Sequence, residues 1–309
     1  MSFDNVLYEP PGPIARRRNR IISAFGAILL LAGLMAVGLR LDESGQFDAK
    51  RWEIFLHPGT LRFLFDGLVA TLVAAVISMI LAFSLAVPLA VARLSDRLWL
   101  RTLAAAYIGC FRAVPLLLLI LFTVILLPSM GLNWSALGYL VFGMVLHHSA
   151  MTAEIVRTGI LSLGRGQREA ALSIGMREHQ AMLWIVLPQA LKLMLPALVS
   201  AVLAIVQDTS LGYIIPYEEL LRRSQQISSF APQTLLQSAF IVTVISGFVS
   251  ALLLALRRWI ERRQAYTSRA VNGSDGAAGS AVFTETLGGI PGATPALGHV
   301  SSQASTRDK

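Results

Sequence analysis

The side chains of this sequence that could bind a polar ligand lie inside long apolar runs. Arg112 lies about ten residues into the run 103–127, which corresponds to roughly 15 Å of helix. A charge at that depth in a bilayer is costly and faces protein or water. Because the guanidinium fork matches a carboxylate, Arg112 is a candidate ligand for a substrate carboxylate. The alternatives are a structural pair with Glu154 or a side chain that reaches the membrane surface.

Pro115 frees a backbone carbonyl and is expected to kink the helix. The kink either lines a cavity or serves packing.

Glu154 and Arg157 are three residues apart and share one helical face within the run 137–157. Glu154 is a candidate for contact with a substrate ammonium group, or it pairs with Arg157 or Arg112. His147 and His148 lie nearer the middle of the same run. A metal site needs further ligands at suitable spacing, and the sequence offers none, so we predict no metal and assign both histidines to a cavity wall or to helix packing.

A third group of polar residues directly follows the run 182–206. It consists of Gln207, Asp208, Thr209 and Ser210. These side chains could form a polar collar in a translocation pathway, or a helix end that is capped by its own side chains. Both interpretations stay open at this point.

The sequence lacks the usual signatures of catalysis. It contains no G-x-x-x-x-G-K-[ST] phosphate loop, so any ATP hydrolysis must come from another chain. It also lacks a Gly-x-Ser-x-Gly turn and a persuasive nucleophile and base. We therefore predict a protein that is not an enzyme and has no cofactor of its own.

The composition sets the class of protein that holds these residues. Of 309 residues, 55% are hydrophobic and only 14% are charged, and the mean hydropathy is +0.63. These values indicate an all-α, polytopic membrane protein in contact with lipid. The net charge of +8 could suggest nucleic acid, but the arginines flank apolar runs, so we expect no nucleic-acid partner. Cys110 is the only cysteine, which excludes an internal disulfide.

Six apolar runs are long enough to cross a bilayer as helices. They cover residues 21–39, 67–92, 103–127, 137–157, 182–206 and 234–256. We expect residues 1–62 to contain the N-terminus, the first span and an outer loop. Residues 63–263 should form the main transmembrane domain. Residues 264–309, rich in Gly, Ala, Ser and Thr from Ser268 onward, should form a disordered tail.

Basic residues indicate the orientation of these spans, because cytoplasmic loops carry an excess of arginine and lysine. The segments predicted to lie outside carry only Arg40, Lys50, Arg51, Arg62, Arg222 and Arg223. Sixteen arginines fall in the segments predicted to lie inside, among them the cluster at 16–20 and the cluster at 257–263. We therefore predict a multi-pass protein of the cell membrane with both termini in the cytoplasm.

The charged loop at about 164–182 separates the fourth and fifth runs and is placed on the cytoplasmic side. Its composition predicts a short charged helix. Ala170, Ala171 and Gly175 would leave a face of small residues that lets another helix come close, which suits docking in a groove of a partner. The alternative is an amphipathic loop that lies on lipid headgroups.

The spacing of this loop resembles E-A-A-x3-G-x9-I-x-L-P, the coupling loop of permease subunits of binding-protein-dependent ABC importers. The residues that carry the resemblance, and that it implies contact the ATPase, are Gly166, Glu169, Ala170, Ala171, Gly175, Ile185, Leu187 and Pro188. Residues 153–160, 187–190 and 111–115 resemble polar amino acid permeases, and the first 53 residues are most similar to the glutamate-uptake members. The resemblance covers roughly residues 5–263 and implies the type I importer permease fold.

One position departs from the family pattern. The resemblance K-[DN]-[ST]-[SA]-L places a lysine where this chain has Gln207. If that lysine contacts Asp208 or the substrate, its absence leaves Asp208 without a nearby cation. The replacement of this lysine by Gln207 affects the prediction of the substrate more than the prediction of the fold.

The resemblance implies a permease subunit for glutamate or another polar amino acid. Its partners would be an ATPase dimer that binds ATP, a second permease subunit, identical or homologous, and an extracytoplasmic substrate-binding protein. Arg112, Pro115, His147, Glu154 and the group 207–210 would line the pathway. The alternatives are a permease for a basic amino acid or an osmolyte, a secondary transporter or channel that needs no ATPase, and a membrane-embedded enzyme or signalling anchor.

Overall fold

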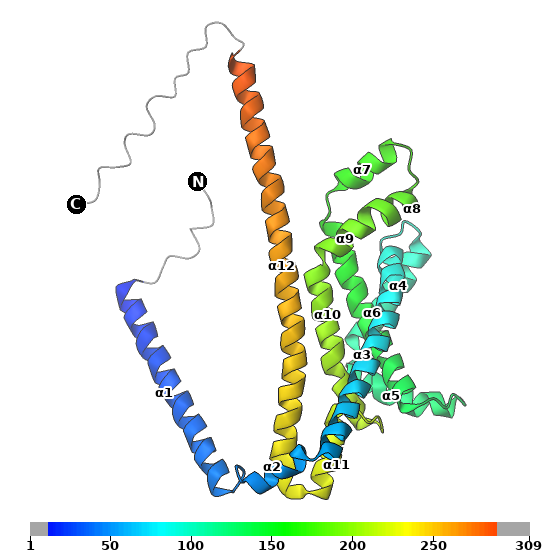
Figure 1. The fold of residues 1–309 in the computed structure, drawn as a ribbon. Coiled ribbons are helices and arrows are strands. Elements are labelled where there is room, and N and C mark those ends of the chain that lie inside the picture. The colour runs from blue at the N-terminus through cyan, green and yellow to red at the C-terminus, as the bar shows by residue number, and fades with distance from the viewer. Residues whose placement is uncertain (1–11, 289–309) are drawn as a thin grey trace, which may run out of the picture. The chain divides into compact units, whose positions relative to one another are not determined.

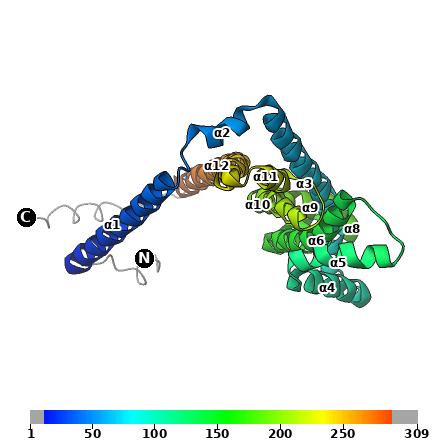
Figure 2. The same cartoon turned by 90° about the horizontal axis from the view of Figure 1, so that it is seen from below.

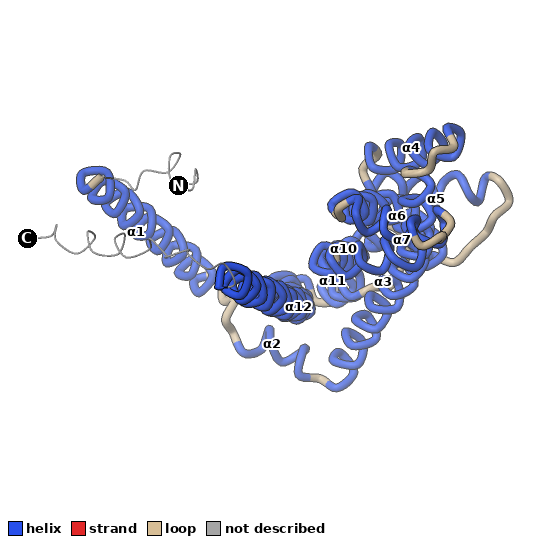
Figure 3. The backbone as a smooth tube through the Cα atoms, turned by 90° about the horizontal axis from the view of Figure 1, so that it is seen from above, coloured by secondary structure: helices blue, strands red, loops and turns tan. Residues whose placement is uncertain are grey.

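The computed structural model describes the backbone of residues 12–288 and, apart from positions 13, 15 and 165, the side chains of residues 12–264. This part of the chain consists of helices and connecting loops and contains no strand (Figure 3). It forms two compact units. The first comprises the chain up to Ser162 together with Ala201–Ala251, and the second comprises Leu163–Ser200 and the chain from Leu252 onward.

The first unit begins with α1 (Pro13–Glu43) and the short α2 (Ala49–Leu56), and continues with four helices (Figure 1). These are α3 (Pro58–Arg93), α4 (Leu98–Ala113), α5 (Leu116–Ser129) and α6 (Ala136–Ser162). The helices α1, α3 and α6 contain the predicted spans 21–39, 67–92 and 137–157. Within the described chain, five helices are long and apolar enough to cross a membrane, or six if one bent pair counts as a single span.

The bent pair replaces the single straight span predicted over residues 103–127. The helix α4 ends at Ala113, α5 begins at Leu116, and their axes differ by 101°. The break lies at Val114 and Pro115, both with extended backbone. Proline has no N–H and disfavours helical geometry in the residue before it, so a helix ends there. The expected kink is therefore a full break, and Arg112 lies in the last turn of α4 rather than in the middle of a straight span.

The core of the first unit is built on α6, which packs against α3, α4 and α5 (Figures 1 and 2). The buried face of α3 carries a small residue at every fourth position: Ala74, Ser78, Ala82, Ala86 and Ala90 are all fully buried. Ser78 Oγ lies 3.7 Å from Met144 Sδ of α6, so this face meets α6. On α6, Gly143 approaches Ile120 of α5 so closely that a Cβ would lie 3.1 Å from its Cα. Small residues at such positions let helices pack closely in a membrane.

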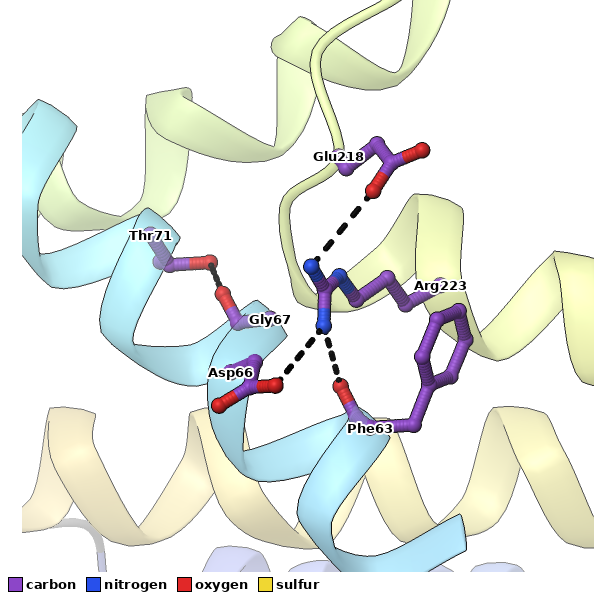
Figure 4. Close-up of polar contacts among 6 residues, drawn as sticks. All are labelled: Phe63, Asp66, Gly67, Thr71, Glu218 and Arg223. Atoms are coloured by element: carbon purple, nitrogen blue, oxygen red, sulfur yellow. Dashed lines mark hydrogen bonds and ion pairs between the residues drawn. The ribbon is translucent and has the colours of Figure 1, made fainter. Parts of the chain in front are cut away.

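A second contact holds α11 (Leu220–Phe230) against the start of α3. Figure 4 shows the Arg223 guanidinium between three acceptors. It donates to the carbonyl of Phe63 at 2.9 Å, lies 3.5 Å from Asp66, and lies 3.4 Å from Glu218. The guanidinium also covers the Phe63 ring, 4.6 Å from its centroid. Because the Arg223 side chain is only 16% exposed, these contacts fix its place on α3.

The first turn of α11 is held by a buried acid. Glu219 is fully buried, and its carboxylate accepts hydrogen bonds from the N–H groups of Leu221 and Arg222, which caps the helix. Burial raises the pKa of Glu219, and these two backbone bonds partly offset that rise. The N–H of Leu220 donates to Thr71 Oγ1 at 3.2 Å. The start of α11 is thus bound to α3 through both backbone and side chains.

The predicted fifth span, 182–206, is divided in the structure. Residues 178–193 form α8 (Glu178–Gln180), the π-helix η2 (Ala181–Val186) and α9 (Leu187–Leu193). After a break at Met194, α10 (Leu195–Asp208) and the 3₁₀ helix η3 (Thr209–Ile214) form the segment that is long enough to cross a membrane. The candidate span therefore begins thirteen residues later than predicted, because Met194 interrupts the helix.

The last helix is α12 (Leu235–Gly288), which contains the predicted sixth span 234–256 except for its first residue, Thr234. The tail expected to be disordered from residue 264 continues this helix as far as Gly288. Its alanines favour a helical backbone. Residues 289–309, the rest of the predicted tail, and residues 1–11 lie outside the described part of the chain.

Gly67→Ala tests the docking of α11. A Cβ at position 67 would lie 3.0 Å from both Leu220 Cα and Arg223 Cδ, so α11 must shift. We expect a loss of ~1–3 kcal/mol in stability, typical of overpacking, measured by thermal unfolding in detergent. Gly59→Ala is the matched control, because Gly59 is on the same helix and a Cβ added there would meet no atom within 4 Å. Equal melting temperatures for the two variants would contradict this packing.

Candidate functional site

The loop at 164–182 contains the short helix α7 (Arg165–Ser173), in the second unit, as predicted. The helix ends at Gly175, whose φ of +86° is a left-handed conformation that favours glycine. The N–H of Gly175 donates to the carbonyl of Leu172, and that of Met176 donates to the carbonyl of Ala171. This pair of bonds is a Schellman motif. Gly175 therefore ends the helix through its backbone conformation.

The turn after α7 is closed by an ion pair. Arg168 donates to Glu178 through two nitrogens, Nε at 2.9 Å and Nη2 at 2.7 Å. Such a two-pronged pair fixes both position and orientation. The side chains are about half exposed, so the pair contributes at most about 1 kcal/mol, but it joins α7 to the residues that follow the turn. Gln167 and Gln189, 3.4 Å apart, add a weaker link to α9.

The motif residues divide between the inside and the outside of this unit. Ala171 is buried, and α7 packs against η2. Leu187 is also buried, and Ile185 is half-buried. Glu169 and Ala170 are exposed, as is Gly166. Exposed Ile174 adds an apolar side chain, 80% accessible, to the same short segment. The outer side of α7 thus combines small, acidic and apolar groups.

A π-helix lies directly before Pro188, the last residue of the motif. In a regular α-helix the ring of Pro188 would collide with the carbonyl four residues earlier, and no N–H would bond to that carbonyl. The wider turn of η2 has a different hydrogen-bond spacing, and the N–H of Leu187 donates to the carbonyl of Met182, five residues back. The distortion thus accommodates Pro188 without ending the helix.

Glu154 forms an ion pair with Arg157 on α6. Arg157 Nε donates to Glu154 Oε1 at 3.0 Å, and Arg157 Nη2 contacts the same oxygen. Both side chains are about three-quarters buried. Arg112 does not join them, because it makes no ion pair with any side chain of the described part of the chain and is exposed. Its position in the last turn of α4 favours a cation, since the helix dipole is negative there.

The two histidines of α6 have different surroundings. His147 Nδ1 lies 3.0 Å from the carbonyl of Phe111, beside the break between α4 and α5. His148 is buried, and its Nε2 lies 3.1 Å from Asp208 Oδ2 of α10. The His148 contact is within ion-pair distance but is not aligned as a hydrogen bond. Asp208, expected to lack a nearby cation because Gln207 replaces the family lysine, thus has the ring of His148 beside it.

The other residues of the group 207–210 lie apart from this contact. Thr209 is buried and donates to the carbonyl of Val206 at 2.7 Å, which is a local cap. Gln207 and Ser210 line a cavity of about 130 Å³, together with Thr71 and Glu219. The structure thus places Gln207 beside α3 and α11, whereas Asp208 contacts α6. Neither Glu219 nor Arg223 was predicted to hold helices together, and their position between the fifth and sixth apolar runs was the only available signal.

The fold and the loop together define a class: an all-helical, multi-pass membrane permease with a short helical element between two of its spans. The chain belongs to the family of binding-protein-dependent transport system inner membrane components, whose model matches residues 84–266, more than half of the chain. It is a transport permease subunit.

Relatives and solved structures agree with this assignment. A glutamate transport system permease protein, GluD of Corynebacterium glutamicum, is 37% identical over 72% of this chain and 83% of its own. A glutamate/aspartate import permease protein, GltK of Escherichia coli O157:H7, is 34% identical over 64% of this chain and 94% of its own. A crystal structure of an amino acid ABC transporter with histidines superposes with a TM-score of 0.61 at 27% identity, covering 66% of this chain and 95% of that one. The MetNI methionine ABC transporter, 15% identical with a TM-score of 0.53, shares the fold.

Gly175→Ala tests the turn that ends α7. An alanine forced to a positive φ costs ~1–2 kcal/mol, so the amides of residues 175 and 176 should exchange with deuterium about 5- to 30-fold faster. Gly166→Ala is the control, since Gly166 is helical with open space around it and the substitution favours the helix. Unchanged exchange at 175 and 176 would show that the turn does not depend on glycine.

Proposed function

We propose that this chain is the membrane-spanning subunit of an ATP-driven importer of amino acids and that its substrate is glutamate or a closely related acidic amino acid. The observation that carries the proposal is the similarity to the glutamate permease of Corynebacterium glutamicum over most of both chains. The exposed helix α7, with the spacing of a coupling loop, supports the ATP-driven part of it.

The second unit has the features of a coupling device. Its exposed helix α7 is joined to the following residues by the Schellman turn and by the pair Arg168–Glu178. It is continuous through η2 and α9 with the spanning segment that begins at Leu195. When an ATPase dimer closes and moves α7, these links pass the displacement to the spans. A rigid-body rearrangement of the spans then switches the pathway between inward and outward access.

The partners follow from this scheme. An ATPase dimer binds ATP and receives Gly166, Glu169 and Ala170 in a groove. A second permease subunit, identical or homologous, completes the pathway, and an extracytoplasmic binding protein delivers the amino acid. The permease binds no cofactor of its own, and both of its termini lie in the cytoplasm.

Arg112 is our candidate for the substrate carboxylate. It is exposed in the single chain at the break between α4 and α5, with no side-chain partner in the described part of the chain. Glu154 is a weaker candidate for the substrate ammonium group, because its carboxylate is engaged by Arg157. Substrate binding at Glu154 would have to compete with that pair.

Uptake in whole cells tests the class and the substrate together. Radiolabelled glutamate is supplied to cells that lack this gene and to cells that regain it, before and after ATP depletion. Unlabelled aspartate, glutamine, arginine and histidine serve as competitors. We expect ATP-dependent uptake that the gene restores and that only acidic amino acids inhibit. Loss of another amino acid's uptake instead would contradict the substrate, and uptake that survives ATP depletion would favour a secondary transporter.

Glu169→Arg tests coupling. Reversing an exposed charge on α7 should lower uptake at least about tenfold while the chain stays in the membrane, because interface charges fix the docking register. Asp96→Arg is the control, since Asp96 is exposed on the loop between α3 and α4. Uptake and the rate of ATP hydrolysis are measured in the same vesicles. Equal uptake by both variants would remove α7 from the mechanism.

A further inference from the structure

The contact between His148 and Asp208 joins two helices that are distant in the sequence. His148 is in the middle of α6 and Asp208 is the last residue of α10. The His148 side chain is 5% exposed and the Asp208 side chain 36% exposed. The atom His148 Nε2 is buried and has no hydrogen-bond partner in the described part of the chain, although Asp208 Oδ2 is 3.1 Å away. A buried ring nitrogen that makes no hydrogen bond lowers the stability of the fold. Its position beside a carboxylate therefore indicates a function.

The charges around this pair are few. The apolar stretch 67–92 of α3 and all of α5 contain no charged residue. On α4, Arg112 lies near the histidines, and Tyr107 bonds to Ser149 of α6. The His147 ring packs edge-on against the His148 ring, with 5.4 Å between the ring centroids. Within the described side chains, His148 is the one basic group that lies within ion-pair distance of Asp208.

An acidic amino acid brings two carboxylates and one ammonium group, and therefore a net negative charge. A bare Asp208 in the pathway would repel it, because like charges interact strongly where water is scarce. His148, whose Nε2 lies 3.1 Å from Asp208 Oδ2, is placed to offset that charge. Gln207, which stands where the family pattern has a lysine, is neutral and lines a cavity beside α3 and α11, so it does not perform this task.

We propose that His148 is a specificity-determining residue, which neutralises Asp208 and thereby admits anionic amino acids to the pathway. The inference rests on the proposed function. It names His148 as the residue that selects substrates by their charge. His148 acts through Asp208 and is therefore a positioning residue rather than a ligand of the substrate.

The test compares three substrates of similar size and different charge: glutamate, glutamine and lysine. Their uptake is measured in vesicles that carry the assembled transporter. His148→Gln should lower the ratio of glutamate to glutamine uptake by about tenfold. His148→Gln combined with Asp208→Asn should restore the ratio, since no charge remains to be cancelled. His57→Gln is the control, because His57 is exposed at the start of α3 and far from α6 in sequence.

Each outcome decides between the two proposals. If glutamate uptake by the wild-type chain is present but His148→Gln lowers glutamate and glutamine uptake equally, His148 is merely structural and the proposed function stands. If Asp208→Asn fails to restore the ratio in the double variant, the inference is likewise wrong. A wild-type chain that imports glutamine or lysine but not glutamate overturns both the acidic substrate and the role of His148.

Discussion

The backbone of a helix in lipid must make its hydrogen bonds within that helix, because no water is present to replace them. The long helices α1, α3, α6 and α12 and the segment 195–214 follow from this constraint. Where the helix is interrupted, the structure provides a local solution. At Pro115 the chain breaks and Val114 becomes extended, whereas before Pro188 the π-helix η2 keeps the helix continuous. The two prolines therefore have opposite consequences, a large bend in the first unit and an uninterrupted helix in the second.

The same constraint governs the charged side chains. Glu154 is bound by Arg157 one turn along the same helix, and Asp208 meets His148 across two helices. Arg112 lies at a helix end, where the dipole favours a cation. Outside the candidate spans, Glu219 caps α11, and Arg223 fastens that helix to α3. Most of these charged side chains hold helices together. Arg112 and, in part, Asp208 are exposed to solvent in the single chain.

Much of this organisation could be predicted from the sequence, because length, hydropathy and the spacing of the loop motif are local properties. The spans within α1, α3 and α6, the short helix after Gly164 and the presence of a bend at Pro115 were of this kind. The size of the bend at Pro115, the break at Met194 and the docking of α11 depend on packing between distant segments, which periodicity does not reveal. The pairing of His148 with Asp208 joins residues sixty positions apart. The positive φ of Gly175 is a further feature that the spacing of the motif did not predict.

We propose that an ATPase binds the exposed side of α7, and cysteine labelling tests this contact. Cys110 is exposed and must first be replaced by serine. Ala170→Cys then places one thiol on the exposed side of α7 and Asp96→Cys places one on the loop between α3 and α4. A membrane-impermeant maleimide is added to inside-out vesicles with and without the assembled ATPase. We predict that the ATPase slows labelling at position 170 by about tenfold or more and leaves position 96 little changed, because an interface excludes solvent. Equal labelling rates at position 170 with and without the ATPase would contradict the account.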